Sequence, residues 1–329
     1  MNTRIEHVSG ASLADGYWQP REAVAEAMRR IAAIAEGDET AVITDRSITF
    51  ANQAERTTIS VEPINVDTWD GQRISECITI RTPLTSFKLF EENRYSFINI
   101  FATTGAIVRD TDGEDAVVSR LPLFEGDDSA LADLYTPMVA YAALVHLVGP
   151  WAGLDYAKIR SGERGPADVA LPGWDEPSRW DPWEFEYAKG KLEDRGACAS
   201  TGPTGLTAEF AWEPGAVSAM LGQRTSLLRI RSDESHPLAG NGLFYRLDLP
   251  PDFDEEEAKS WAARLNRIEA ESIDTPPFLG AWTTRTGSRT LSFAGFWPNV
   301  MYQRGTATNI AFWCAARSHL ARLMIGNSS

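Results

Sequence analysis

Apolar and polar positions along the chain follow the period of a helix and the period of a strand in turn. Apolar residues at helical spacing predict a helix from Pro20 to Ala35, since proline is tolerated in a first helical turn and Gly37 ends the pattern. Runs rich in β-branched residues come next, separated by turn-forming pairs such as Asp70-Gly71. These runs predict a meander of three or four strands at 40–44, 47–50, 57–61 and 76–82.

The pattern changes after Pro83. Phenylalanines between Phe87 and Phe101 recur at helical spacing and predict a second helix that ends near Gly105. Two strands joined by a hairpin-like turn are expected at 106–110 and 116–124. A third helix is expected at 129–147, where Pro137 predicts a kink.

A stretch rich in Trp, Pro and Gly at 151–179 interrupts this regularity and is interpreted as a linker. Four of the eleven tryptophans lie in it or just beyond it. Large aromatic side chains usually dock on a surface. We therefore expect a linker packed across two domains, with a ligand-stacking aromatic cluster as the alternative.

The second half repeats the order of elements. Its clearest helix starts at Asp254, where Glu257 three residues later resembles a capping box and Ala258, Leu265 and Ile268 form an apolar stripe. Before it come an expected helix and three strands, and after it two strands and a final helix. Their ranges are 183–196, 206–212, 226–232 and 242–249, then 278–284, 289–297 and 307–324.

Both halves therefore read α-βββ-α-ββ-α, which predicts a duplication. Matching residues in the two halves add to it: Asn99 with Asn266, Gly105 with Gly280, and Ser119 with Ser292. The expected fold is α+β, with two tandem domains whose antiparallel sheets each have helices on one face. The expected divisions are an N-terminal segment 1–19, a first domain 20–150, the linker 151–179 and a second domain 180–329.

Composition narrows the function classes. The chain has 329 residues, is 43% hydrophobic and carries 31 Lys and Arg against 46 Asp and Glu, a net charge of −15. This is a folded composition of about two domains, and its charge repels nucleic acid. It also lacks the run of about 18 apolar residues that spans a membrane. We expect a soluble, cytoplasmic protein without nucleic-acid binding or membrane insertion.

Motifs for catalysis are scarce. The three cysteines lie far apart, and Cys77 and Cys314 are expected to be buried hydrophobes. Asp233 to His236 place acid, serine and histidine together, but neighbours on a chain seldom converge on one atom, so a polar loop is expected. The glycine-rich stretch 200–205 lacks the end of a phosphate loop. We expect no enzyme, no catalytic residues, no cofactor and no metal site.

The order of elements resembles the type III secretion chaperone fold shared with YbjN-like proteins, as two tandem copies covering most of 20–148 and 180–326. The first copy contributes ISECITIRTPL, SFINIFATTGAIVRD and AVVSRLPLF, and the second contributes GLFYRLDLP, AARLNRIEAES, FLGAWTT and TLSFAGFW. The resemblance implies an acidic binder of unfolded or extended polypeptide. Such binders are homodimers, so two copies in one chain imply an internal pseudo-dimer. The tryptophan-rich linker departs from the family pattern.

A sheet covered by helices on one face leaves its other face for a partner. Strand 242–249 alternates, so Phe244 is expected beside Arg246 on the wetter face, and Trp282 and Phe296 are expected to add apolar surface. We therefore expect a polypeptide-binding protein that uses Phe244, Trp282 and Phe296 to hold a protein or peptide client. The alternatives are that these residues pack the two domains together, that the chain is a structural or regulatory subunit without a client, or that it is an enzyme with an unrecognised site.

Overall fold

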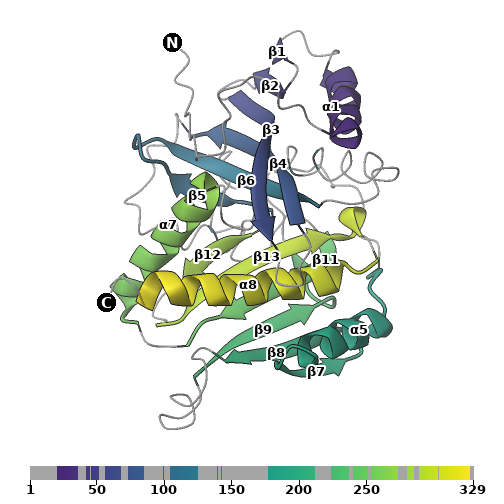
Figure 1. Cartoon of the computed structure of the whole chain (residues 1–329), viewed down its shortest axis with the longest axis vertical. Helices are drawn as coiled ribbons and strands as arrows, with labels where there is room; N and C mark the ends of the chain where they lie inside the picture. Colours follow the sequence, from purple (N-terminus) through teal and green to yellow (C-terminus); the bar gives the residue numbers. More distant parts are fainter. Residues whose placement is uncertain are drawn as a thin grey trace.

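Two antiparallel sheets and the helices packed on them form the α+β structure seen in the computed structural model (Figure 1). The expected helices at 87–101 and 129–147 lie outside the described residues except for Asn99, Val139 and Ala142, and the segment 1–19 and most of the linker also lie outside them. The described residues are 21–35, 42–44, 46–51, 56–67, 73–84, 99, 104–124, 139, 142, 177–211, 224–236, 240–250, 253–272, 280–284, 289–302 and 304–326.

The first sheet has six strands in the order β1-β2-β3-β4-β6-β5. Helix α1 packs beside β2 and buries Val24, Ala27, Met28 and Ile31, which recur at helical spacing. The bounds are α1 Glu22–Ala35, β1 Val42–Ile43, β2 Ser47–Ala51, β3 Arg56–Asp67, β4 Arg73–Pro83, β5 Ala106–Arg109 and β6 Asp115–Phe124.

The second sheet has the order β7-β8-β9-β11-β13-β12, with the short strand β10 paired to β11. If β10 is left out, the strands of the second sheet have the same neighbour order, relative to their order in the chain, as the strands of the first sheet. The bounds are α5 Pro182–Glu193, β7 Cys198–Gly202, β8 Gly205–Ala211, β9 Thr225–Arg231, β10 Ser235–His236, β11 Gly240–Asp248, α7 Glu255–Glu271, β12 Ala281–Thr284, β13 Leu291–Pro298, η6 Asn299–Met301 and α8 Thr306–Gly326.

The six strands of the first sheet correspond to the six runs predicted there, whereas the second sheet has two strands more than the expected five. Strand β7 was missed because CASTG is made of small residues with little β-propensity, and the glycine-rich stretch 200–205 is the hairpin that joins β7 to β8. Strand β10 was missed because its two residues lie in a polar segment. Pairing to the neighbouring strand makes these segments extended, and this information is absent from local composition.

The strand pairing in each sheet shows whether the matched residues of the two halves occupy equivalent positions. Asn99 donates to the carbonyl of Ile107 and accepts from its N–H at 3.1 and 2.7 Å. Asn266 makes the same two bonds to Trp282 at 2.8 and 2.7 Å. The serine match is wrong. Ala106 pairs with Val118 and Ala281 with Ala294, so Ser119 and Ser292 occupy different positions along their strands.

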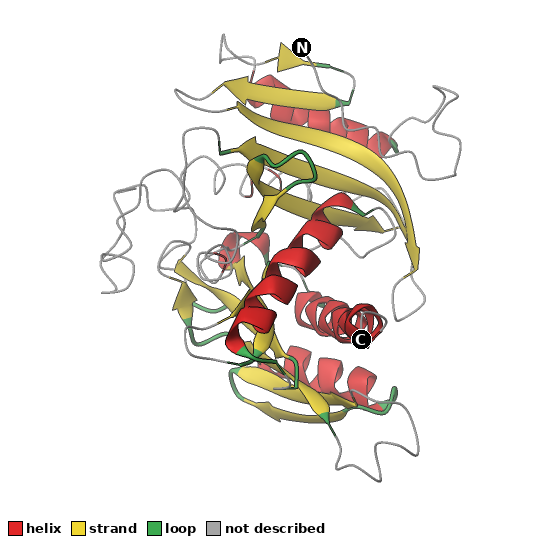
Figure 2. Cartoon of the chain, turned by 90° about the vertical axis from the view of Figure 1, so that its left-hand side faces the viewer, coloured by secondary structure: helices red, strands yellow, loops and turns green. Residues whose placement is uncertain are grey.

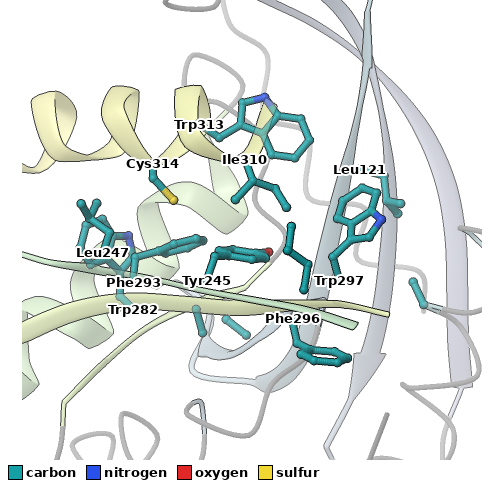
Figure 3. Close-up of a cluster of buried hydrophobic side chains, with 14 of the residues drawn as sticks. Leu121, Tyr245, Leu247, Trp282, Phe293, Phe296, Trp297, Ile310, Trp313 and Cys314 are labelled. Atoms are coloured by element: carbon teal, nitrogen blue, oxygen red, sulfur yellow. The ribbon is translucent and has the colours of Figure 1, made fainter. Parts of the chain in front are cut away.

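Helices α5, α7 and α8 cover one face of the second sheet. Figure 3 shows Tyr245, Phe293 and Trp297 pointing toward Ile310 and Cys314 of α8, while Phe296 points to the other side. Buried residues from both sheets belong to one core. In Figure 2 the front helix, α7, runs between the upper and lower sheets, and it contacts β12 of one and β5 of the other. The two halves are therefore packed together around α7.

Candidate functional site on the second sheet

The described helices cover one side of the second sheet, and on its other side β8, β9 and β11 carry exposed and half-buried residues, whereas β12 and β13 are buried there. Along β11, Leu243, Tyr245 and Leu247 are buried under the helices, as the alternation predicts, while Phe244, Arg246 and Asp248 are half-buried. We call this second side the open face. It consists of Thr207 and Glu209 on β8, Leu227, Arg229 and Arg231 on β9, and Phe244, Arg246 and Asp248 on β11.

The strand register places Phe244 at the centre of a row across three strands. Phe244 lies opposite Arg231 on one side and opposite Phe296 on the other. Phe296 is fully buried and packs on the His236 ring, with 5.1 Å between ring centroids. The row therefore passes from a closed apolar end at Phe296, through half-buried Phe244, to the solvent-exposed guanidinium of Arg231.

The next two rows on this face carry an ionic network centred on Asp248. Its carboxylate accepts from Arg229 Nη1 at 2.6 Å and from Arg246 Nε at 2.5 Å. Ser292 Oγ donates to the same carboxylate at 2.6 Å and accepts from Arg246 Nη2 at 3.0 Å. Arg246 is thereby fixed from two sides. Arg229 remains about half exposed, with 47% of its side chain accessible.

Arg231 is held by Asp233 just beyond the end of β9. The two guanidinium nitrogens Nε and Nη2 donate to the two carboxylate oxygens at 2.9 and 2.8 Å. This hydrogen-bonded pairing lowers the pKa of Asp233 to about 2 and raises the pKa of Arg231. Both groups are thus charged across the physiological range, and the Arg231 side chain is still 47% exposed.

The open face differs in charge from the rest of the chain. It has three guanidinium groups and two carboxylates, and Asp233 beside Arg231 adds a third carboxylate, so its local charge is close to zero, whereas the whole chain carries −15. Guanidinium groups bind carboxylates with a planar, forked geometry. Arginine beside an aromatic ring is also a common composition at the centre of protein interfaces. The face therefore offers both an apolar anchor and anion recognition.

Two of the three residues expected to bind a partner are not accessible. Trp282 lies on the helix-covered face, where its indole N–H donates to Glu269 Oε1 at 2.7 Å. Phe296 is on the same side as Phe244 but is buried at the closed end of its row. The expected exposure of Trp282 and Phe296 is wrong, because the covering of these strands depends on segments distant in sequence. Phe244 alone keeps partial exposure.

The residues examined for catalysis occupy separate environments. Ser235 is exposed and contacts Asn241, whereas neighbouring His236 is buried against Phe296. Burial raises the pKa of Cys77 to about 11 and of Cys314 to about 12, so both are protonated thiols at neutral pH. Among the described residues, no three His, Cys, Asp or Glu side chains are grouped to hold a metal ion.

Comparisons with known proteins found no matching family model, curated protein or solved structure. Within the described part of the chain, no helix is both long enough and apolar enough to cross a membrane.

Proposed function

We propose that this protein binds an extended, acidic polypeptide segment on the open face of the second sheet. The position of Phe244 is the observation that carries the proposal. This side chain is half-buried and lies opposite exposed Arg231. The next residue on the same face of β11, Arg246, belongs to the network with Asp248 and Arg229. A client would place an apolar side chain against Phe244 and carboxylates against Arg229 and Arg231.

The spacing of the open face suits a polypeptide. Alternate residues of a strand lie about 7 Å apart on one side, and alternate side chains of an extended client have the same repeat. Nucleic acid fits less well, since the carboxylates of Asp248 and Asp233 lie beside the arginines and would repel a continuous run of phosphates. At physiological salt, screening over about 8 Å weakens the repulsion between an acidic client and the distant acidic residues of the chain, so the exposed guanidinium groups of the face act at short range.

We also propose that the two halves are copies of one module and form an internal pseudo-dimer. The equal neighbour order of the two sheets, without β10, supports this idea. So do Asn99 and Asn266, each of which binds the backbone of one residue on β5 or β12; we call these two side chains the asparagine clamps. Gly105 and Gly280, which directly precede the two clamped strands, also support the idea. The likeness to secretion chaperones and YbjN-like proteins remains a proposal based on the order of elements.

The test uses two labelled peptides of twelve residues and compares their affinities by fluorescence anisotropy. One alternates Asp and Leu, and the other alternates Lys and Leu, so that only the sign of the charge differs. We expect the acidic peptide to bind at least about tenfold more tightly, a difference of about 1.4 kcal/mol. Phe244→Asp removes the anchor and adds a repelling charge, so it should lower the acidic peptide's affinity at least about tenfold.

Tyr187→Asp is the matched control, because Tyr187 is an exposed aromatic residue on α5, away from the open face. This variant makes the same change in charge and in aromatic content and should leave affinity unchanged within about twofold. Equal affinities for the two peptides would contradict the charge selectivity. An equal effect of Tyr187→Asp and Phe244→Asp would contradict the location of the site.

A further inference from the structure

A buried polar cluster lies at the seam between the two halves, away from the open face. Its centre is Glu269 on α7, whose carboxylate is fully buried. Oε1 accepts from the Trp282 indole at 2.7 Å, and Oε2 accepts from Arg317 Nε of α8 at 3.0 Å. The Arg317 guanidinium also lies over the Phe293 ring, 4.3 Å from its centroid. Glu269 thus joins α7 to β12 and to α8.

Arg120 reaches the same helix from the first half. It lies on β6, is fully buried, and its Nη1 donates to the backbone carbonyls of Glu269 and Ser272, both at 2.6 Å. These carbonyls belong to the end of α7, where the last C=O groups of a helix have no partner within the helix. Close by, the backbone N–H of Thr111, just after β5, donates to Glu271 Oε1 at 3.2 Å.

The sequence of α7 makes this contact favourable. Its last turn contains Glu269 and Glu271 and no basic residue. Carboxylates are unfavourable at the negative end of a helix dipole, and a cation there is favourable. The missing positive charge is supplied from other elements, by Arg317 of α8 on the Glu269 side chain and by Arg120 of the first half on the backbone.

We infer that Arg120 is a latch that stabilises the end of α7 and closes the two halves into one cooperative unit. The first half supplies the cap that the second half lacks. The placement of Glu269, and through it of Trp282 and Arg317, depends on this cap. The chain then unfolds as one body, and loosening the latch uncouples the halves before either one unfolds.

The test measures amide hydrogen exchange and urea unfolding of the full chain. Arg120→Met keeps most of the side-chain volume but removes both hydrogen bonds and the charge. We expect the amides of residues 268–272 to exchange at least about tenfold faster, and unfolding to broaden or split into two steps. Arg120→Lys keeps the charge, but its ammonium nitrogen lies one bond nearer the backbone than Nη1 and should reach the two carbonyls less well, so it should show a smaller increase, about threefold.

Arg109→Met is the control, because Arg109 lies on β5 of the same half and pairs with Asp115 within that sheet. In this variant, the amide hydrogen-exchange rates of residues 268–272 should stay within about twofold of those in the unchanged chain. If Arg120→Met does not fold, the comparison of Arg120→Lys with Arg109→Met decides the question. Unchanged exchange at 268–272 in the Arg120 variants, or equal increases in Arg109→Met, would overturn the inference.

Discussion

At the scale of single residues, Asn99 and Asn266 replace a missing strand. Each binds both the N–H and the C=O of one residue on the outermost strand of its sheet. Backbone groups on a sheet edge lack partners on one side, and burying them without partners is costly. An amide side chain has one donor group and one acceptor, so it satisfies both. Aspartate has only acceptors when ionised and cannot do so.

The two glycines that precede the clamped strands have no room for a Cβ atom. A Cβ at Gly280 would lie 2.5 Å from the Ala294 carbonyl oxygen, and its φ of +141° disfavours other residues. A Cβ at Gly105 would clash with the equivalent carbonyl of Val118. The two clamped strands thus begin with the same close approach to the neighbouring strand.

Asn266→Ala is predicted to destabilise the fold strongly. It leaves the N–H and C=O of Trp282 buried without partners, and each such loss costs about 1–3 kcal/mol. We expect the free energy of unfolding, measured by urea denaturation, to fall by about 2–4 kcal/mol. Arg267→Ala changes the next residue on the same helix and should cost less than about 0.5 kcal/mol. A cost below 1 kcal/mol for Asn266→Ala would refute the role of the clamp.

At the scale of elements, local signals predict the helices best. The start of α7 was predicted from Asp254, and its side chain accepts from the Glu257 backbone N–H at 2.7 Å, which confirms the N-cap. Strands β3 and β4 were placed correctly but extend beyond their predicted ends. Strands β7 and β10 were missed because pairing, and no local preference, makes them extended.

The candidate site was predictable only in part, for a related reason. Phe244 follows from alternation within one strand. The arginines beside it come from β9, and their position depends on the register between strands that are distant in sequence. Burial of Trp282 and Phe296 depends on how other segments pack over them. The pattern of residues within a single strand carries no information about the register between strands or about burial by other segments.

Strand β9 supplies the prediction that belongs to this scale. The double variant Arg229→Glu with Arg231→Glu reverses the charge of the strand on the open face while leaving Phe244 in place. Both side chains are half exposed, so the fold should tolerate the change, although it places the new carboxylates beside Asp248 and Asp233 and should lower the free energy of unfolding somewhat. We expect peptide preference to invert, with the Lys-Leu peptide binding more tightly than the Asp-Leu peptide in the same anisotropy assay. An unchanged preference would show that these arginines do not select the client.

At the scale of the whole molecule, the two sheets act as one packed body. Buried residues from both sheets belong to one main core, and α7 contacts both sheets (Figure 2). The buried Glu269–Arg317 pair is costly to break, by about 3–5 kcal/mol when one partner is removed, because an unpaired charge stays buried. The two sheets have the same neighbour order once β10 is left out, and Arg120 of the first half supports the end of α7 in the second half.

This arrangement leaves the open face apart from the seam. The seam is built from β5, β6 and α7, whereas the open face lies on β8, β9 and β11. Mutations can therefore change peptide binding and the packing of the two halves separately. A variant at Arg120 should affect cooperativity, and a variant at Phe244 should affect peptide affinity.

Cross-link mapping tests the central proposal most directly. The Asp-Leu peptide is made with photoreactive leucine at its central position, irradiated with the full chain, and the attached residues are identified by mass spectrometry. The proposal predicts cross-links to Phe244, Leu227 and neighbouring residues of β9 and β11, lost in Phe244→Asp and kept in Tyr187→Asp. Cross-links concentrated on the exposed aromatic residues of α5, Trp183 and Tyr187, with none on β9 or β11, would contradict it.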